Sequence, residues 1–169
     1  MHPLARQVVD VPDFPQPGIL FRDITPLLRT HFSEAIDALD ALWSAAEWNA
    51  TEAVAGVESR GFILAAALAE RRGKGFVPIR KKGKLPPPVV ERHYALEYGS
   101  GVLEMQRGDG RLLLIDDVLA TGGTLAASAR LAVDAGFQIE HSGVLIDLGI
   151  AQNYLCLDRA VRSVIRYGT

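Results

Sequence analysis

The stretch Leu112-Leu-Leu-Ile-Asp-Asp-Val-Leu-Ala-Thr-Gly-Gly-Thr124 decides how the rest of the sequence is interpreted. It begins in a predicted strand, residues 111–115, that is apolar on both faces, as a central strand of a parallel sheet must be. The adjacent carboxylates Asp116 and Asp117 follow, and a glycine-rich turn then leads into a predicted helix over 124–135. The pattern therefore predicts strand, tight turn and helix, which is the repeating unit of an α/β sheet.

The same alternation of strands and helices continues on both sides of this stretch. Further strands are predicted at 53–57, 75–79, 139–146 and 163–167, and further helices at 32–48 and 61–72. Pro78 cannot donate to a sheet ladder and is expected to mark the end of its strand. Residues 1–30 are rich in proline and predict an irregular arm with a short helix starting at Thr25-Pro26, and 82–101 predict a long excursion of marginal strand character. Such an alternation implies right-handed crossovers and a mostly parallel central sheet flanked by helices.

The composition is that of one globular domain, expected to span residues 1–169. Hydrophobic residues make up 49% of the chain and charged residues 22%. Its apolar runs are far shorter than the roughly 20 residues that span a bilayer. The single cysteine, Cys156, cannot form an internal disulfide, and the N-terminus lacks the basic start and apolar stretch of a secretory signal. The sequence therefore predicts a cytoplasmic protein without membrane association, with Cys156 as a small core residue.

The charge of the chain is nearly balanced, with a net value of −2. No overall positive field would recruit nucleic acid, and no nucleic-acid partner is expected. Two basic clusters, 71–74 and 80–84, stand out locally, although from charge alone solvated loops explain them better. A polyanionic ligand would have to be bound by these side chains, by backbone amides or by a metal.

The turn after the central strand has the composition of a phosphate-binding cradle. Gly122 and Gly123 permit a tight turn with converging amides, between the hydroxyls of Thr121 and Thr124, and the following helix adds free amides and its positive dipole end. The dipole contributes about 0.3–1 kcal/mol and each hydrogen bond to a charged group about 1.5–3 kcal/mol. Micromolar affinity needs about 8 kcal/mol, so several amides and both hydroxyls must act together. The two aspartates would repel phosphate but accept hydrogen bonds from sugar hydroxyls, so a phosphorylated pentose satisfies both halves.

Simpler explanations account for parts of this string only. An ordinary strand–helix turn would explain Gly122-Gly123-Thr124 alone, but not paired acids with threonines on both sides. The turn is not a dinucleotide-binding Gly-x-Gly-x-x-Gly, which occurs nowhere in the chain. Nor is Gly83-Lys84 a Walker loop, because it lacks the upstream glycine and the following Ser or Thr.

Residues 114–124 resemble the phosphoribosyl pyrophosphate motif of the type I phosphoribosyltransferases. Three further segments, in the same order along the chain, resemble the adenine phosphoribosyltransferases of that family: Phe14-Pro-Gln-Pro-Gly-Ile-Leu-Phe-Arg-Asp-Ile24, Glu58-Ser-Arg-Gly-Phe62, and Arg80-Lys-Lys-Gly-Lys-Leu-Pro86 followed by Tyr94-Ala-Leu-Glu-Tyr-Gly99. The resemblance covers about Asp10 to Gly136. It implies a small base-binding hood at about 1–30 and a core at about 31–169, with a mobile flap at about 81–101.

The resemblance also implies a reaction of purine salvage. Adenine N9 would displace pyrophosphate from C1 of phosphoribosyl pyrophosphate to give AMP, through a transition state resembling an oxocarbenium ion. Mg²⁺ is the implied cofactor; it would bridge substrate oxygens and keep water as its other ligands, with no direct ligand from the protein. A homodimer is expected, because the family often forms dimers.

The resemblance also implies roles for the residues that match the motifs of the family. Asp116 and Asp117 would hold the ribose 2- and 3-hydroxyls and favour positive charge at C1, while Glu97, with Tyr98 beside it in the flap, would exchange a proton with adenine N7. The other residues would bind substrate: the 5-phosphate at Ala120, Thr121, Gly122, Gly123 and Thr124, pyrophosphate at Ser59, Arg60, Gly61, Arg80 and Lys84, and the base at Leu20, Phe21 and Arg22. Phe21 would stack on the purine, although the residues alone allow a core role equally well. A cis peptide between Glu58 and Ser59 is also implied.

The sequence departs from the family pattern at two places, and two other functions stay open. Glu58 stands where the family usually has Asp, and the connection at 105–110 is shorter. A 6-oxopurine phosphoribosyltransferase would differ mainly in the base pocket. A non-catalytic regulator of the same fold would sense phosphoribosyl pyrophosphate, but it would usually carry a nucleic-acid-binding surface, and no helix-turn-helix is appended here.

Overall fold

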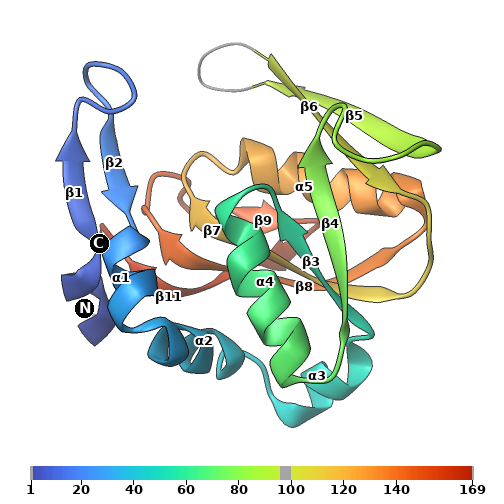
Figure 1. The fold of residues 1–169 in the computed structure, drawn as a ribbon, viewed down its shortest axis with the longest axis horizontal. Coiled ribbons are helices and arrows are strands. Elements are labelled where there is room, and N and C mark those ends of the chain that lie inside the picture. Colours follow the sequence, from blue (N-terminus) through green and yellow to red (C-terminus); the bar gives the residue numbers. More distant parts are fainter. Residues whose placement is uncertain (1, 96–99, 169) are drawn as a thin grey trace.

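A seven-stranded sheet forms the centre of the protein (Figure 1). The computed structural model describes residues 2–95 and 100–168. The strands of this sheet are β3 (Ala53–Val57), β4 (Gly75–Lys81), β5 (Val89–Ala95), β6 (Ser100–Gln106), β7 (Arg111–Leu119), β8 (Gln138–Asp147) and β11 (Arg162–Arg166). They lie in the order β11-β8-β7-β3-β4-β6-β5, parallel from β11 to β4 and antiparallel at β6 and β5. The predicted mostly parallel sheet is confirmed.

Helices cover both faces of this sheet and bury two apolar clusters. The helices are α1 (Thr25–Thr30), α2 (Phe32–Asp40), α3 (Ala45–Ala50), α4 (Arg60–Arg71) and α5 (Gly123–Ala135). On one face α1, α2 and α4 pack their apolar sides on the sheet around Leu39, Leu64 and Leu113. On the other face α5 packs around Leu131 and Leu114, together with residues of β6. Figure 1 shows α4 in front of the sheet and α5 behind it.

The prediction of a single helix at 32–48 is wrong, because the structure has two helices there, α2 and α3. The second helix starts anew at Ser44, which accepts a hydrogen bond from the Glu47 amide (3.3 Å) and donates its own amide to the Glu47 carboxylate (2.8 Å). This reciprocal pair is a capping box, which fixes the start of a helix. The apolar spacing runs through both helices and hides the break between them.

The strand predicted at 75–79 does not end at Pro78 but continues to Lys81. The carbonyl of Ile79 accepts a hydrogen bond from the Glu58 amide, so Ile79 faces β3 and the nitrogen of Pro78 faces the other way. On that side β6 pairs only from Arg80 onward, and no donor is needed at the proline. Only marginal strand character was predicted for 82–101. The structure has two strands there, β5 and β6, which pair antiparallel over Val89 to Ala95.

The first 30 residues are more regular than the predicted irregular arm. A short 3-10 helix, η1 (Pro3–Gln7), precedes a two-stranded hairpin of β1 (Val9–Pro12) and β2 (Leu20–Asp23). The helix at Thr25-Pro26 is confirmed, with its first amide bonded to the Asp23 carboxylate (2.9 Å). The Arg22 guanidinium lies 4.1 Å from the ring centre of Tyr167, which holds the hairpin against the C-terminal end of the chain.

The remaining predicted elements agree with the structure to within a few residues, apart from the length of the central strand. β7 runs four residues further than predicted, so Asp116 and Asp117 lie inside it, paired with β8 rather than beyond its end. A last small hairpin joins β9 (Leu155–Cys156) to β10 (Arg159–Ala160), and Cys156 is buried as expected. No helix formed by the described residues is long and apolar enough to cross a membrane.

Candidate functional site

The carboxyl end of β7 opens into a cavity of about 340 Å³. Asp116 and Asp117 line it together with the whole turn from Val118 to Leu125, and Glu58, Lys81 and Tyr94 complete its wall. The predicted cradle residues, Ala120, Thr121, Gly122, Gly123 and Thr124, are therefore brought together with both aspartates. In Figure 1 this turn lies between the β1–β2 hairpin on one side and the β5–β6 hairpin on the other.

The turn presents backbone amides to this cavity. Gly122 has a left-handed backbone (φ 88°), which glycine adopts without steric cost, and it stands at the N-terminus of α5. Its carbonyl accepts the first helical hydrogen bond from the Ala126 amide (2.9 Å). No side chain of the described residues caps α5, so its first amides are available to an anion.

The two aspartates are buried and close to one another. Each is only 8% exposed, and the Asp117 amide donates to Asp116 Oδ1 (2.8 Å). Burial raises the pKa of Asp116 well above its ordinary value, and the neighbouring Asp117 carboxylate raises this pKa further. Asp117 Oδ2 lies 2.6 Å from Arg60 Nε, yet no N–H points at it well enough to form a hydrogen bond. The pair combines one ion-paired carboxylate with one that resists ionisation.

Gly61 is required for the approach of α4 to these aspartates. A Cβ on Gly61 would lie 3.0 Å from Asp116 Oδ1 and 3.1 Å from the Ile115 carbonyl. Ser59 precedes the first helical residue, Arg60, and the Glu58–Ser59 peptide is cis, as the family resemblance implied. The 58–61 segment thus lies directly beside the carboxylates, although Ser59 and Gly61 do not line the cavity itself.

A second cavity of about 400 Å³ adjoins the first beneath the N-terminal hairpin. The predicted base-binding residues Leu20, Phe21 and Arg22 line it, and so does Arg60. Val118 and Ala120 line both cavities, which therefore meet at the end of β7. Leu148 and Ile150 complete the apolar wall, and they were not predicted because they follow a strand that is distant in sequence.

Arg60 connects the two cavities. Its guanidinium carbon lies 4.7 Å from the ring centre of Phe21, Nη1 donates to the Arg22 carbonyl (3.4 Å), and Nε pairs with Asp117. The resemblance assigned Arg60 to pyrophosphate, but in this structure its contacts are with the base pocket and the aspartates. Phe21 lines a cavity and is not a core residue.

The basic residues 80–84 lie next to the cavity rather than in it. Arg80 Nε donates to Glu58 (3.2 Å) and its Nη1 to the Lys84 carbonyl (3.2 Å), so Arg80 and Lys84 do not line the cavity, whereas Lys81 does. Glu58 also accepts the Lys81 amide (3.0 Å). Burial alone would raise the pKa of Glu58, but these donors lower it below its ordinary value. The longer side chain at this position is thus used to anchor β4.

The buried carboxylate of Glu104, on β6, binds backbone amides of the basic loop, the segment that contains the basic residues 80–84. It is 2% exposed and accepts the amides of Gly83 (2.9 Å), Lys84 (2.6 Å) and Leu85 (2.6 Å). Burial would raise the pKa of Glu104, but the three amides bring it below its ordinary value. Sequence reasoning missed this residue, because its partners lie about 20 residues away and bond only through their backbone.

Replacing Glu104 with glutamine is expected to lower the free energy of unfolding by about 1–3 kcal/mol. The amide nitrogen of glutamine is a donor and would face backbone donors, leaving at least one buried N–H without an acceptor. Chemical denaturation at pH 7 measures the change. Since the folded pKa of Glu104 is lowered, its contribution is fully present above the ordinary value of 4.5 and is lost as pH falls through the folded pKa, so the difference should shrink in acid.

Glu91 supplies the matched control for this variant. It lies opposite Glu104 on the neighbouring strand, is exposed, and pairs with Lys82 (2.8 Å). Glu91→Gln should change the free energy of unfolding by less than about 1 kcal/mol, as exposed ion pairs do. Equal effects of the two substitutions would contradict the role given to the Glu104 carboxylate.

Two predicted site residues cannot be placed, because Glu97 and Tyr98 lie outside the described residues. The strand that leads toward them is described, and its Tyr94 lines the cavity. Burial raises the pKa of Tyr94, although a hydrogen bond with the Thr124 side chain acts in the opposite direction. Tyr94 lies within the predicted flap and begins the motif that carries the resemblance there, but no role was predicted for its side chain.

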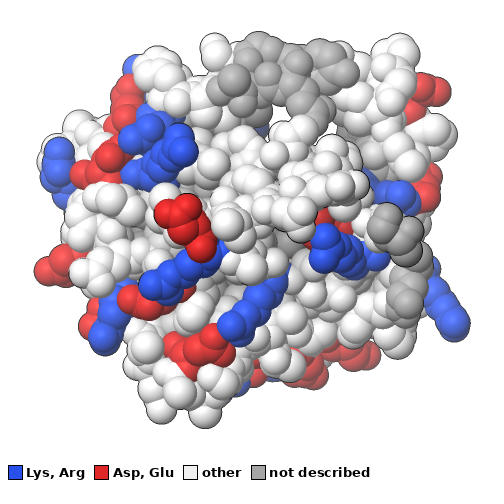
Figure 2. Space-filling view, turned by 180° about the vertical axis from the view of Figure 1, so that it is seen from behind, with Lys and Arg blue, Asp and Glu red and all other residues white. Residues whose placement is uncertain are grey.

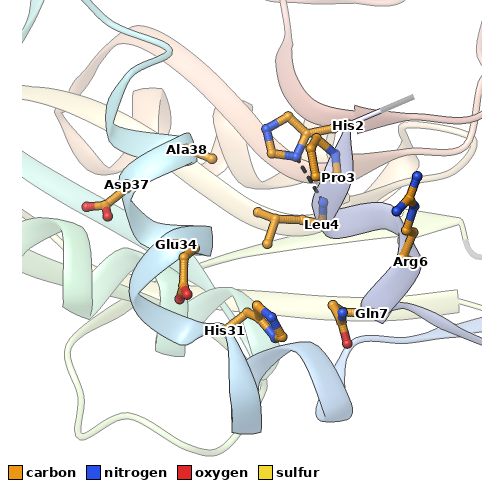
Figure 3. A pocket seen from close by; sticks show the side chains of 9 residues that line it. All are labelled: His2, Pro3, Leu4, Arg6, Gln7, His31, Glu34, Asp37 and Ala38. Carbon is orange, nitrogen blue, oxygen red and sulfur yellow. Dashed lines mark hydrogen bonds between the residues drawn. The ribbon is translucent and has the colours of Figure 1, made fainter.

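The predicted site residues do not line the largest of the cavities described for this structure. A larger cavity of about 650 Å³ lies between η1 and the start of α2, and its lining includes His2, Arg6, His31, Glu34 and Asp37 (Figure 3). None of the predicted site residues lines it. On the face shown in Figure 2, positive and negative side chains are interspersed. Among residues 2–95 and 100–168, His, Cys, Asp and Glu side chains form no group of three that could hold a metal ion.

The parallel sheet, the glycine turn after its central strand and the N-terminal hairpin beside it define the class of the protein as a type I phosphoribosyltransferase. The phosphoribosyl transferase domain family matches residues 33–153. An adenine phosphoribosyltransferase of Hydrogenovibrio crunogenus is 48% identical over 98% of this chain and 97% of its own. The chain belongs to the adenine phosphoribosyltransferase family.

Solved structures agree with this assignment. The adenine phosphoribosyltransferase of Rhodothermus marinus matches with a TM-score of 0.85 and 42% identity, covering 96% of both chains. The enzyme of Saccharomyces cerevisiae, solved with adenine and an imino-altritol bisphosphate, matches with a TM-score of 0.87 and 32% identity, covering 95% of this chain and 96% of its own. The chain is thus a transferase of the pentosyl-transferring type.

Proposed function

We propose that this protein transfers the 5-phosphoribosyl group of phosphoribosyl pyrophosphate to N9 of adenine, giving AMP and pyrophosphate in purine salvage. The observation that carries the proposal is the pair of cavities that meet at Val118 and Ala120. One offers two carboxylates and a ring of amides and hydroxyls, which suits a phosphorylated ribose. The other is mostly apolar with an aromatic wall, which suits a flat base. Their junction is where a bond between sugar and base would form.

The aspartates are proposed to bind the ribose and to favour the transition state. Ionised carboxylates accept strong hydrogen bonds from hydroxyl groups, and negative charge beside the ring stabilises positive charge that develops at C1. The ion pair of Asp117 with Arg60 keeps its carboxylate beside the sugar position. Binding of a cationic or hydroxyl-rich ligand would also lower the pKa of Asp116 from its raised value and restore its charge.

The amides and hydroxyls of residues 120–124 are proposed to hold the 5-phosphate, and Leu20, Phe21 and Arg22 the adenine. Support for the base comes from the yeast relative, which was solved with adenine. Arg80 and Lys84 are proposed to bind pyrophosphate after the loop rearranges, since both lie next to the cavity wall formed by Glu58. Glu97 is proposed to exchange a proton with adenine N7, and Tyr98 to cover the bound substrate; both roles rest on the resemblance.

Magnesium fits this donor set as an ion that arrives with the substrate. Two carboxylates are too few for a dedicated protein cage, and Mg²⁺ commonly keeps water and phosphate oxygens as ligands. Asp116 and Asp117 would hold it indirectly, through water and the ribose hydroxyls. When bound, the ion would neutralise charge on the pyrophosphate leaving group.

A homodimer is the proposed assembly, and an apolar surface supports it. Ile63 is 45% exposed and Phe76 is 38% exposed, and Phe76 packs edge-on against Phe62 (5.6 Å between ring centres). Exposed apolar side chains gathered on one helix and the adjacent strand are common where a second copy binds. A cytoplasmic location stays a prediction of the sequence.

The experiment that tests the proposal is an assay of the four purine bases, each with Mg²⁺ and phosphoribosyl pyrophosphate. Formation of AMP and pyrophosphate from adenine, with adenine preferred in competition, is the expected result. Preference for hypoxanthine, guanine or xanthine would overturn the choice of base. Binding of phosphoribosyl pyrophosphate without any product from any base would favour the regulator.

A further inference from the structure

Tyr154 reaches the phosphate turn from a part of the chain that sequence analysis left without a role. It lies in the segment between β8 and β9, and its hydroxyl donates a hydrogen bond to the Gly122 carbonyl (2.8 Å) across 32 residues of sequence. Its ring lies directly on Gly122, where a Cβ would come within 2.2 Å of a ring atom. The contact is therefore close in both its polar and its apolar part.

The bonded carbonyl belongs to a peptide unit that faces the cavity. The Gly122 carbonyl accepts from Tyr154 and from the Ala126 amide (2.9 Å), so two donors fix its direction. In a trans peptide the C=O and N–H groups point in opposite directions. The N–H of the same peptide is that of Gly123, which must then point away from α5, toward the cavity that both glycines line.

The Tyr154 hydroxyl is suited to act as a permanent donor. Burial raises the pKa of Tyr154 to about 12, so the group keeps its proton throughout the pH range in which proteins usually work. Glycine is free to rotate its peptide planes, and two consecutive glycines at 122 and 123 would otherwise leave this peptide weakly constrained. The tyrosine adds a second constraint on this carbonyl to the single helical hydrogen bond from the Ala126 amide.

We propose that Tyr154 is a positioning residue for the 5-phosphate, because it fixes the Gly122–Gly123 peptide with the Gly123 N–H directed at the phosphate. The inference rests on the proposed function, in which this turn binds the 5-phosphate. It assigns to the C-terminal segment a role in substrate binding that does not require any of its side chains to touch the substrate.

The test compares two ligands that differ only in the phosphate, AMP and adenosine. Tyr154→Phe removes the hydroxyl and keeps the ring. Its Kd for AMP should rise about three- to tenfold, as the loss of one hydrogen bond predicts, while its Kd for adenosine should not change. In the steady state the KM for phosphoribosyl pyrophosphate should rise by a similar factor, with kcat at saturation close to that of the wild type.

The exposed neighbour Gln152 supplies the control, since Gln152→Ala alters the same segment and should leave both Kd values unchanged. An unchanged ratio of the two Kd values in Tyr154→Phe would overturn the proposal, whether both Kd values stay constant or both rise together. A wild-type protein that binds AMP no better than adenosine would instead overturn the proposed function, and the role of Tyr154 with it.

Discussion

Replacing Asp116 with asparagine is expected to raise the free energy of unfolding of the ligand-free protein at pH 7 and to lower kcat/KM for phosphoribosyl pyrophosphate about 10- to 100-fold. Asparagine has the same shape and can still accept the Asp117 amide through its oxygen. It removes a buried negative charge that lies beside a second carboxylate, and this charge opposes folding. In the proposed function the same charge accepts hydrogen bonds from the sugar hydroxyls and stabilises the transition state, so stability and activity should change in opposite directions.

The pH dependence of the stability difference follows from the direction of the pKa shift. The pKa of Asp116 in the folded protein lies above its ordinary value of 3.8. Its contribution to stability is therefore fully present below 3.8 and is lost as pH rises through the folded pKa. The gain from asparagine should be small at acid pH, grow as pH rises and then level off. Denaturant titrations of both proteins at several pH values measure it.

Asp147 offers a matched control for this substitution. It is buried to a similar degree (7% exposed), ends the adjacent strand β8, accepts the Gly149 amide (2.8 Å) and lies 3.4 Å from Arg166 Nε. Since its partners are a backbone amide and a guanidinium, Asp147→Asn should lower the free energy of unfolding or leave it unchanged, with kcat/KM close to that of the wild type. A loss of stability in Asp116→Asn as large as that in Asp147→Asn would contradict the prediction.

The parts of the fold that were predicted correctly are those determined by neighbours in sequence. The apolar run of β7, the two glycines and the amphipathic helix that follows are local signals, and each appears where the pattern placed it. The strand character of 82–101 was underestimated because it depends on pairing between Val89–Ala95 and Ser100–Gln106. Pro78 was misjudged for the same reason: a strand tolerates proline where its neighbour is missing, and only the sheet order reveals that.

The candidate site shows the same division. Sequence pattern and resemblance predicted a phosphate cradle at 120–124 and base-binding residues at 20–22, and the structure places both sets of residues at cavities that meet at the end of β7. Contacts that hold these parts in place were not predictable, because they join a side chain to backbone atoms far away in sequence. Glu104 binds three amides of the basic loop and Tyr154 binds one glycine carbonyl, and a backbone partner leaves no trace in the sequence.

Replacing Gly122 with alanine is expected to lower kcat/KM for phosphoribosyl pyrophosphate by about 100-fold, because a phosphate that loses even two charge-assisted hydrogen bonds loses about 3 kcal/mol or more. Two obstacles act together at this position. Alanine in a left-handed backbone costs roughly 1–2 kcal/mol, and its Cβ would lie 2.2 Å from the Tyr154 ring. The turn and the aromatic ring cannot both keep their places, so the amides proposed to bind the 5-phosphate must separate. Steady-state kinetics with varied phosphoribosyl pyrophosphate measures the loss.

Gly73 separates the effect of backbone strain from that of the collision. It also has a left-handed backbone (φ 60°), but a Cβ there would meet no atom within 4 Å. Gly73→Ala should therefore lower the free energy of unfolding by about the same amount that alanine costs in the left-handed backbone of Gly122, while kcat/KM stays near the wild-type value. If Gly122→Ala kept wild-type kcat/KM, the converging amides of the turn would not be the phosphate site. If both variants lost activity equally, general destabilisation rather than the geometry of the turn would be the cause. A large loss confined to Gly122→Ala is the result expected of a turn whose shape depends on close contact between a glycine and a tyrosine.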